Sequence, residues 1–327
     1  MEARAYDEID DMDRFHYVRL KNLKSSVRFI YQIARKWHPH LVNKIKGSIY
    51  ADLDLVWRYL ETRGKGIKVA VLDSGIDDDH QLLTHAIRES RCFIGMSSNC
   101  HDEADHGTHV AGIIAARGRP GKYMGIAPEV ELYIGKVLDS RTNGAPEDVQ
   151  RGIDWAIDRK VQIINLSLSS QSVLPKVREK LQNAIKQGIV VVCSAGRAPY
   201  ELQYPGKYEE LITVGTSHKN NPADGFPEGP EIDVIAPGVN IKSTDHEGKF
   251  VTHSGTSQSA PIVTGFIALY LAKYREELSQ MEPHTIHSII ESTIIDSAKQ
   301  IDFEGGKYSL FDPIGFLYSK PKQKTYE

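Results

Sequence analysis

The stretch Ile67-Lys-Val-Ala-Val-Leu-Asp73 decides the fold class, because it is a short apolar run, rich in β-branched residues, that stops at a turn. Such a run predicts a strand buried on both faces, as strands of parallel sheets are. From here onward, strand patterns alternate with amphipathic helix patterns. This alternation predicts a mostly parallel sheet with helices on both faces, which is a three-layer α/β fold.

The elements that follow are predicted from the same two periodicities. We predict helices over residues 106–116, 146–159 and 175–187, and strands over residues 130–138, 161–168 and 189–193. The ligand crevice of such a sheet lies at the carboxyl ends of its strands. Asp73, Ser169 and Ser194 fall at these strand ends, so we expect a functional site there.

Composition excludes several classes of protein. The chain has 327 residues, of which 40% are hydrophobic and 25% charged, enough for one large globular domain. A net charge of −3 gives no attraction to nucleic acid or anionic lipid. No apolar run approaches the ~20 residues that span a bilayer, so we predict no nucleic-acid partner and no membrane contact.

The cysteines indicate a reducing compartment. Cys92, Cys100 and Cys193 are too few, and odd in number, for a disulfide framework. A Cys92–Cys100 disulfide is the less favoured alternative. The acidic residues near Met1 do not resemble a secretory signal, so we predict a cytoplasmic protein.

The N-terminal region differs from the rest of the chain. No acidic residue occurs between Arg14 and Tyr50, where basic residues and a near-helical apolar spacing predict a basic amphipathic helix. We therefore divide the chain into a basic extension (1–50), a catalytic domain (51–320) and a tail (321–327). The extension is interpreted either as a helix packed on the main domain or as a regulatory or partner-binding arm.

Three blocks carry the residues of nucleophilic catalysis. They are Val69-Ala-Val-Leu-Asp73-Ser-Gly75, Asp105-His106-Gly-Thr-His-Val-Ala-Gly112 and Ser254-Gly-Thr-Ser257-Gln-Ser-Ala-Pro261. A serine hydroxyl is a weak nucleophile until a histidine accepts its proton, and a carboxylate must orient that histidine. Gly255 permits a tight turn before Ser257, so the nucleophile can sit at a helix start, where backbone N–H groups face a developing oxyanion.

These blocks closely resemble the subtilisin family of serine peptidases, and the chain order Asp, His, Ser is that family's order. The resemblance extends over about residues 67–290 and includes the landmark blocks 125–128, 164–168, 204–205 and 236–239. It implies a subtilisin-like fold and a serine endopeptidase with a polypeptide substrate. In that reading Asp73 orients His106, His106 acts as general base and then acid, and Ser257 attacks the peptide carbonyl.

The resemblance also implies where a peptide binds. An extended substrate would pair with edge segments around residues 140–144 and 166–169, adding a strand to the protein. The side-chain pocket would lie between two short walls. Its predicted residues are Ser167, Leu168, Ser169, Ser194, Ala195 and Gly196.

The chain departs from the family pattern in two functional places. Arg197 stands where relatives have the Asn that shares the oxyanion hole with the Ser257 backbone, so we expect low or regulated activity. The calcium-ligand positions of relatives are matched here by Leu82 and the loop 117–121, which lack suitable oxygens, so we predict no cofactor and no metal.

Other readings of these blocks remain. A pseudopeptidase that binds peptides or a partner is the main alternative, because of Arg197 and the basic extension. A transferase that passes the acyl group to an amine is another. His106 and His109 do not fit a metalloprotease helix, which spaces its histidines by four with a Glu between them.

Overall fold

The computed structural model describes residues 53–95, 99–118, 123–196, 201–227, 229 and 231–322. The chain divides into two compact units, Met1–Asp52 and Leu53–Glu327. The predicted extension, residues 1–50, and most of the predicted tail, residues 321–327, lie outside the described residues. The following description concerns the second unit by itself.

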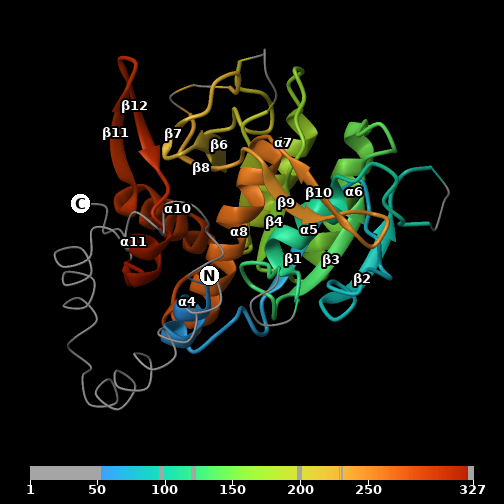
Figure 1. Ribbon diagram of the computed structural model, residues 1–327, viewed down its shortest axis with the longest axis horizontal. Coiled ribbons are helices and arrows are strands. Elements are labelled where there is room, and N and C mark those ends of the chain that lie inside the picture. Colours follow the sequence, from blue (N-terminus) through green and yellow to red (C-terminus); the bar gives the residue numbers. More distant parts are fainter. Residues whose placement is uncertain are drawn as a thin grey trace, which may run out of the picture. The chain divides into compact units, whose positions relative to one another are not determined.

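A ten-stranded sheet forms the centre of the described part of the chain (Figure 1). Its spatial order is β11-β12-β8-β6-β5-β4-β1-β3-β2, with β7 paired to β6. Apart from the antiparallel pairs β11–β12 and β6–β7, neighbours run parallel. The strands are β1 (Lys68–Asp73), β2 (Ile87–Cys92), β3 (Glu131–Lys136), β4 (Ile163–Leu166), β5 (Val190–Ser194), β6 (Ile212–His218), β7 (Asn221–Pro222), β8 (Val234–Pro237), β11 (Lys299–Phe303) and β12 (Gly306–Leu310). A separate antiparallel hairpin consists of β9 (Ile241–Thr244) and β10 (Phe250–His253).

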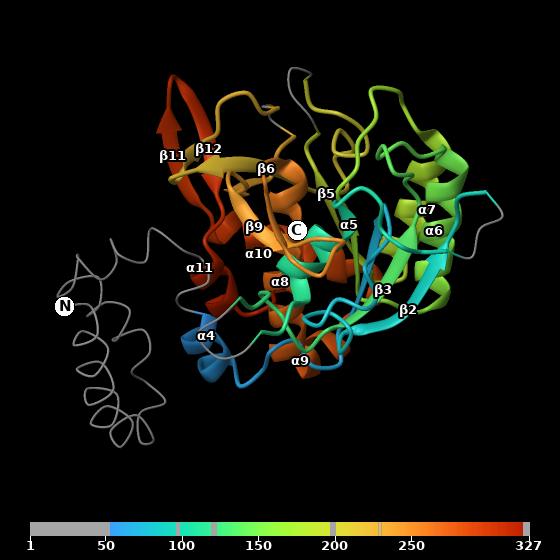
Figure 2. The ribbon, with the colours of Figure 1, turned by 45° about the vertical axis from the view of Figure 1, so that its right-hand side comes forward.

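Helices cover both faces of the sheet (Figure 2), which confirms the predicted three-layer α/β fold. Leu166 belongs to an apolar cluster shared with α6 and α7 on one face. Its neighbour Asn165 points to the opposite face and accepts a hydrogen bond from Thr264 of α8 (2.8 Å), because successive side chains of a strand alternate. The helices are α4 (Leu53–Leu60), α5 (Gly107–Ala115), α6 (Pro146–Asp158), α7 (Pro175–Lys186), α8 (Thr256–Lys273), α9 (Arg275–Ser279), α10 (Ile286–Ser297) and α11 (Pro313–Tyr318), with a 3₁₀ turn at Pro283–Thr285.

The strand order places a crevice beside β1. Strand β1 lies between β3 and β4, with Val71 opposite Ile134 on one side and Asn165 on the other. The chain visits β2 and β3 on one side of β1 before it builds β4, β5 and β6 on the other. Ligands of open α/β sheets bind at such a switch point, beyond the carboxyl ends of the strands.

Of the predicted strands, 130–138 and 161–168 occur with shorter bounds, and 189–193 occurs shifted by one residue. The predicted strand 130–138 ends at Lys136, because the amides of Val137 and Leu138 both turn to the carbonyl oxygen of Asp73 (2.8 and 3.1 Å). The edge strand β2 was not predicted. Its sequence, Ile-Arg-Glu-Ser-Arg-Cys, is half exposed and lacks the apolar run of the central strands.

Candidate active site

Asp73 and His106 meet at the carboxyl end of β1. His106 lies just before the first residue of α5, and its Nδ1 is 2.7 Å from Oδ1 of Asp73. The Asp73 side chain has no exposed surface, whereas 21% of the His106 side chain is exposed. The same Oδ1 accepts the backbone N–H of Ser74 at 2.7 Å. A buried carboxylate at Nδ1 places the other ring nitrogen, Nε2, where it can exchange a proton with a ligand.

The Asp73 carboxylate also changes the basicity of His106. Burial by itself would lower the pKa of His106. The charge of Asp73 and the hydrogen bond to it outweigh burial, and Asp102 adds to the effect, so the pKa lies above its ordinary value of 6.5. His106 is therefore a stronger base than a free histidine and also a stable imidazolium.

A buried network below His106 holds the two catalytic segments together. Ser74 donates from its hydroxyl to Oδ1 of Asp102 (2.8 Å) and accepts the backbone N–H of Gly107 (2.9 Å). Oδ2 of Asp102 accepts the backbone N–H of Thr108 at 2.8 Å. Burial would raise the pKa of Asp102, but these hydrogen bonds and one from Ala104 hold it below the ordinary value. The sequence prediction did not include Ser74 or Asp102.

The hairpin β9–β10 is attached to α5 by its side chains. Ser243 and Thr244 donate to the carbonyl oxygens of His109 (2.7 Å) and Thr108 (2.8 Å). The ring of His109 is fully buried, with Nε2 3.0 Å from the carbonyl oxygen of Ile241. Burial lowers the pKa of His109 to about 3. His109 is thus a neutral packing residue in the interface between helix and hairpin.

A second carboxylate–histidine pair lies next to His106. Asp105 has a positive φ of 59°, and its Oδ1 accepts both the backbone N–H and the ring Nδ1 of His246 from the β9–β10 turn. The hydrogen bond to Asp105 raises the pKa of His246. This pair ties the turn of the hairpin to the residue before His106.

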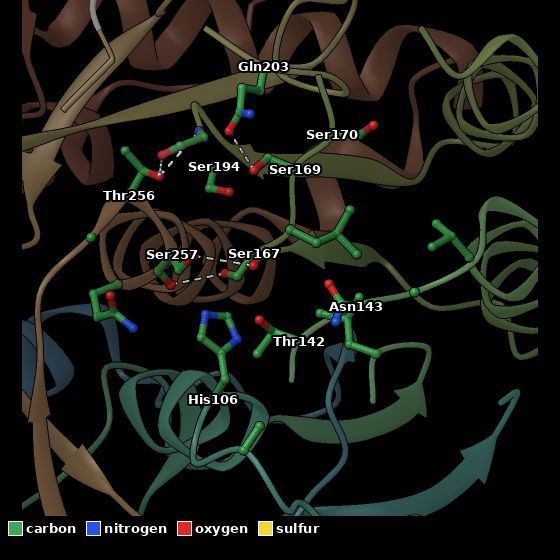
Figure 3. A pocket seen from close by; sticks show the side chains of 18 of the residues that line it. His106, Thr142, Asn143, Ser167, Ser169, Ser170, Ser194, Gln203, Thr256 and Ser257 are labelled. Atoms are coloured by element: carbon green, nitrogen blue, oxygen red, sulfur yellow. Dashed lines mark hydrogen bonds between the residues drawn. The ribbon is translucent and has the colours of Figure 1, made fainter. Parts of the chain in front are cut away.

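Ser257 is the second residue of the long helix α8 and lies opposite His106, as Figure 3 shows. Its hydroxyl donates to the carbonyl oxygen of Ser167 at 3.3 Å, and the Ser167 hydroxyl donates to the Ser257 carbonyl oxygen at 3.0 Å. Within the described residues no hydrogen bond joins Ser257 to His106. A rotation about the Cα–Cβ bond of Ser257 would move its hydroxyl from Ser167 towards the imidazole.

The end of β5 is joined to the start of α8. Thr256 donates from its hydroxyl to the carbonyl oxygen of Gly196 (2.6 Å) and accepts the N–H of Gly196 (3.3 Å). The residue before Arg197 is thereby bound to the residue before Ser257. Arg197 itself lies outside the described residues.

One cleft of about 760 Å³ contains most of the predicted binding residues. It is lined by His106 and Ser257, and by Ser167, Leu168, Ser169, Ser194 and Gly196 among the predicted pocket residues. Ala195 does not line it. Its side chain is fully buried and its amide bonds to Val214 of β6 (3.1 Å), because Ala195 still follows the pleat of the sheet.

The cleft also contains residues that the sequence prediction missed. Gln203 and His253 line it together with Gln258, which follows Ser257. The predicted edge segment 140–144 contributes Arg141, Thr142, Asn143 and Gly144. Gln203 and His253 belong to no recognisable sequence pattern, and only the fold brings them to the cleft. Gln258 stands in the recognised block around Ser257, but the sequence analysis gave it no role.

The described residues include only part of the two segments that match the calcium-ligand positions of relatives. Leu82 contributes its carbonyl oxygen to the backbone N–H of Arg117 (2.8 Å), and residues 119–122 of the loop lie outside the described residues. Among the described residues, Asp77, Asp78 and His101 form a group whose ligand atoms lie within 4.8 Å of one another. Among the described residues, Cys92, Cys100 and Cys193 form no disulfide.

A three-layer α/β domain with a histidine and a serine at one cleft, and a buried aspartate bonded to the histidine, has the arrangement of a serine hydrolase. Residues 64–311 match the model of the subtilase family (peptidase family S8). The chain therefore belongs to the subtilase family, and it is a serine endopeptidase of the subtilisin type.

Individual relatives agree with this assignment. An intracellular serine protease of Paenibacillus polymyxa is 38% identical over 278 residues, covering 81% of this chain and 84% of the relative. The major intracellular serine protease of Bacillus subtilis is 39% identical over 262 residues, covering 75% and 82%. The crystal structure of a cold-adapted subtilisin-like serine proteinase superimposes with a TM-score of 0.65 at 26% identity, covering 77% of this chain and 91% of that one. None of the described helices is long and apolar enough to cross a membrane.

Proposed function

We propose that Ser257, His106 and Asp73 are the catalytic triad of this endopeptidase. The observation that carries the proposal is the buried 2.7 Å contact between His106 and Asp73 at the cleft that Ser257 enters from α8. The Ser257 oxygen attacks the substrate carbonyl carbon while His106 takes the hydroxyl proton. His106 then returns a proton to the leaving amine as the C–N bond breaks. Water hydrolyses the acyl-enzyme by the same steps in reverse.

The oxyanion of the tetrahedral intermediate would be held by the backbone N–H of Ser257 and by Arg197. The hydrogen bonds between Gly196 and Thr256 support this proposal, because they bind the two donor-bearing segments to each other. A guanidinium can donate a strong charge-assisted bond to an oxyanion. If Arg197 instead points away, only one donor remains and the basal rate is low, by about 10²–10³ for a lost donor, a figure that the subtilisin enzymes themselves supplied.

The substrate would be an extended polypeptide. The segments 141–144 and 167–170 line opposite borders of the cleft and expose backbone groups to which a peptide strand can bond. Asp139 shapes the first segment, since its Oδ1 accepts the amides of Arg141 and Asn143, both at 2.8 Å.

Labelling with a fluorophosphonate tests the triad. We expect the wild-type protein to be labelled at Ser257 and to cleave peptides. Ser257→Ala should lose both properties while it remains folded. Ser254→Ala is the matched control, because this hydroxyl lines the same cleft but binds the amide of Asn240. Peptidase activity that survives in Ser257→Ala would refute the assignment.

One observation favours a second candidate, the pseudopeptidase. The Ser257 hydroxyl bonds to Ser167 and not to His106, as it would in a protein that binds peptides without cleaving them. Turnover by wild type, Arg197→Ala and Arg197→Asn separates the candidates. A faster Asn variant would show that Arg197 gives no oxyanion help, and a much slower Ala variant that it is a donor. Three inactive proteins that also resist fluorophosphonate would establish the pseudopeptidase.

We also propose a cytoplasmic location and a regulatory role for residues 1–50. The names of the two intracellular relatives support the first proposal. The absence of acidic residues between Arg14 and Tyr50 supports the second. Deletion of residues 1–45 should change activity or partner binding in a salt-dependent way. Unchanged activity, solubility and partner binding would show that the segment has no regulatory role.

A further inference from the structure

Gln203 joins the two walls of the side-chain pocket. One wall is the segment after β4 with Ser169, whose hydroxyl donates to Oε1 of Gln203 at 2.8 Å. The other wall ends at Gly196, where an added Cβ would lie only 2.7 Å from the same Oε1 and 2.8 Å from Cβ of Gln203. Gly196 has φ = 110°, a conformation that only glycine adopts readily. The glutamine side chain therefore lies against one wall and is bonded to the other.

The backbone holds this glutamine in place from both sides. The N–H of Gln203 donates to the carbonyl oxygen of Ala195 (3.0 Å), and the N–H of Lys207 donates to the carbonyl oxygen of Gln203 (3.0 Å). The next residue, Tyr204, exchanges both backbone hydrogen bonds with Ser170 (2.7 and 2.9 Å). Gln203 itself is only 7% exposed. These bonds fix the backbone of Gln203, and swinging its side chain aside would break the hydrogen bond from Ser169.

The position of Gln203 relative to Ser257 determines which end of the pocket Gln203 closes. Ser167 is bonded to Ser257, and two residues further along the same segment Ser169 is bonded to Gln203. Figure 3 shows these two pairs at opposite ends of the pocket, with Ser194 between them. A substrate side chain that enters between the walls from the scissile carbonyl must therefore point at Gln203.

We propose that Gln203, held by Ser169, closes the far end of this pocket and selects substrates with a small, uncharged side chain before the scissile bond. The groups that such a side chain would meet are neutral: the hydroxyls of Ser169 and Ser194 and the amide of Gln203. An aromatic side chain would have to displace the amide and leave the Ser169 hydroxyl without its partner. The proposal rests on the proposed cleavage at Ser257.

Tetrapeptide anilides that differ only in the residue before the scissile bond test the pocket. With wild type we expect kcat/KM to be at least about tenfold higher for Ala than for Phe, since hydrophobic pockets discriminate by about 10–200-fold per size step. Gln203→Ala should move the Ala-to-Phe ratio at least about tenfold towards Phe, mainly by raising the value for Phe. Gln203→Glu keeps the size and the acceptor oxygen, so it should keep the preference for Ala.

The same peptides separate this proposal from the proposed function. In the Ser257→Ala variant, calorimetry measures the affinity for uncleaved peptides with Ala or Phe, and therefore the selectivity of the pocket without catalysis. We expect the same preference for Ala in binding. Adding Gln203→Ala to this variant should shift the ratio of affinities towards Phe. A preference in binding without turnover by wild type would refute the cleavage mechanism and support the pocket. A wild-type preference for Phe, or a ratio unchanged in a folded Gln203→Ala variant, would overturn the role of Gln203.

Discussion

His287 should make the protein less stable in acid, and the size of the effect can be worked out. This residue of α10 is 2% exposed, and its Nε2 lies 3.3 Å from the carbonyl oxygen of Val191 in β5. Burial lowers the pKa of His287 to about 4, although the bond to Val191 acts in the opposite direction. The folded protein therefore keeps this imidazole neutral at a pH where the unfolded chain protonates it.

The direction in which stability changes with pH follows from proton uptake by the unfolded chain. Below about pH 6.5, the pKa of an unperturbed histidine, the unfolded state binds a proton at His287 that the folded state does not bind until about pH 4. The free energy of unfolding therefore falls as pH decreases through this window, by about 1.4 kcal/mol per unit. Between pH 7 and pH 5 the loss from this one residue amounts to about 2 kcal/mol.

Urea unfolding at the two pH values measures this loss. The experiment uses the Ser257→Ala background to prevent self-digestion, and it compares the pH 7 to pH 5 change before and after His287→Gln. We expect the glutamine variant to lose about 2 kcal/mol less. His284→Gln is the matched control, because His284 is exposed one turn earlier in the chain. An equal pH dependence in all three proteins would refute the reasoning.

Three further predictions concern the cleft and its surroundings. Since the pKa of His106 is raised above 6.5, the pH profile of kcat/KM should rise through a midpoint above that value, and Asp73→Asn should lower the midpoint and cost about 10⁴ in rate; an unmoved midpoint would contradict this. The hydroxyl of Ser217 in β6 is buried and has no hydrogen-bond partner among the described residues, so Ser217→Ala should leave the urea midpoint unchanged or higher. Because Leu82 offers no side-chain oxygen, the thermal midpoint should not climb between chelator and millimolar Ca²⁺.

The sequence was most informative where short segments carry their own chemistry. Asp73, His106 and Ser257 each stand in a block whose neighbours dictate a local turn or helix start, so a triad could be proposed before the fold was known. The central strands β1, β3, β4 and β5 were equally clear, whereas the buried strand β6 was not predicted. Burial on both faces demands unbroken apolar runs, such as Val190 to Cys193, that few other structures need.

Residues whose roles depend on distant partners could not be predicted. Gln203 acquires its place from Ser169, which is 34 residues away in the chain. Asp102 acquires its place from Ser74, 28 residues away. A single glutamine or aspartate in a loop carries no periodicity, and its surroundings exist only once the sheet has brought those loops together. The half-exposed edge strand β2 was missed because an edge position relaxes the apolar pattern.

The position of β1 in the middle of the sheet has a consequence for the newly made chain. Strand β1 pairs with β3 and β4, and the proposed nucleophile Ser257 follows only after β10. Contacts between segments so far apart in sequence form slowly. During synthesis from the N-terminus, the ribosome releases Asp73 and His106 while Ser257 has yet to be made. The proposed triad therefore stays incomplete, and the chain cannot cleave peptides through it, until nearly the whole catalytic domain has been translated.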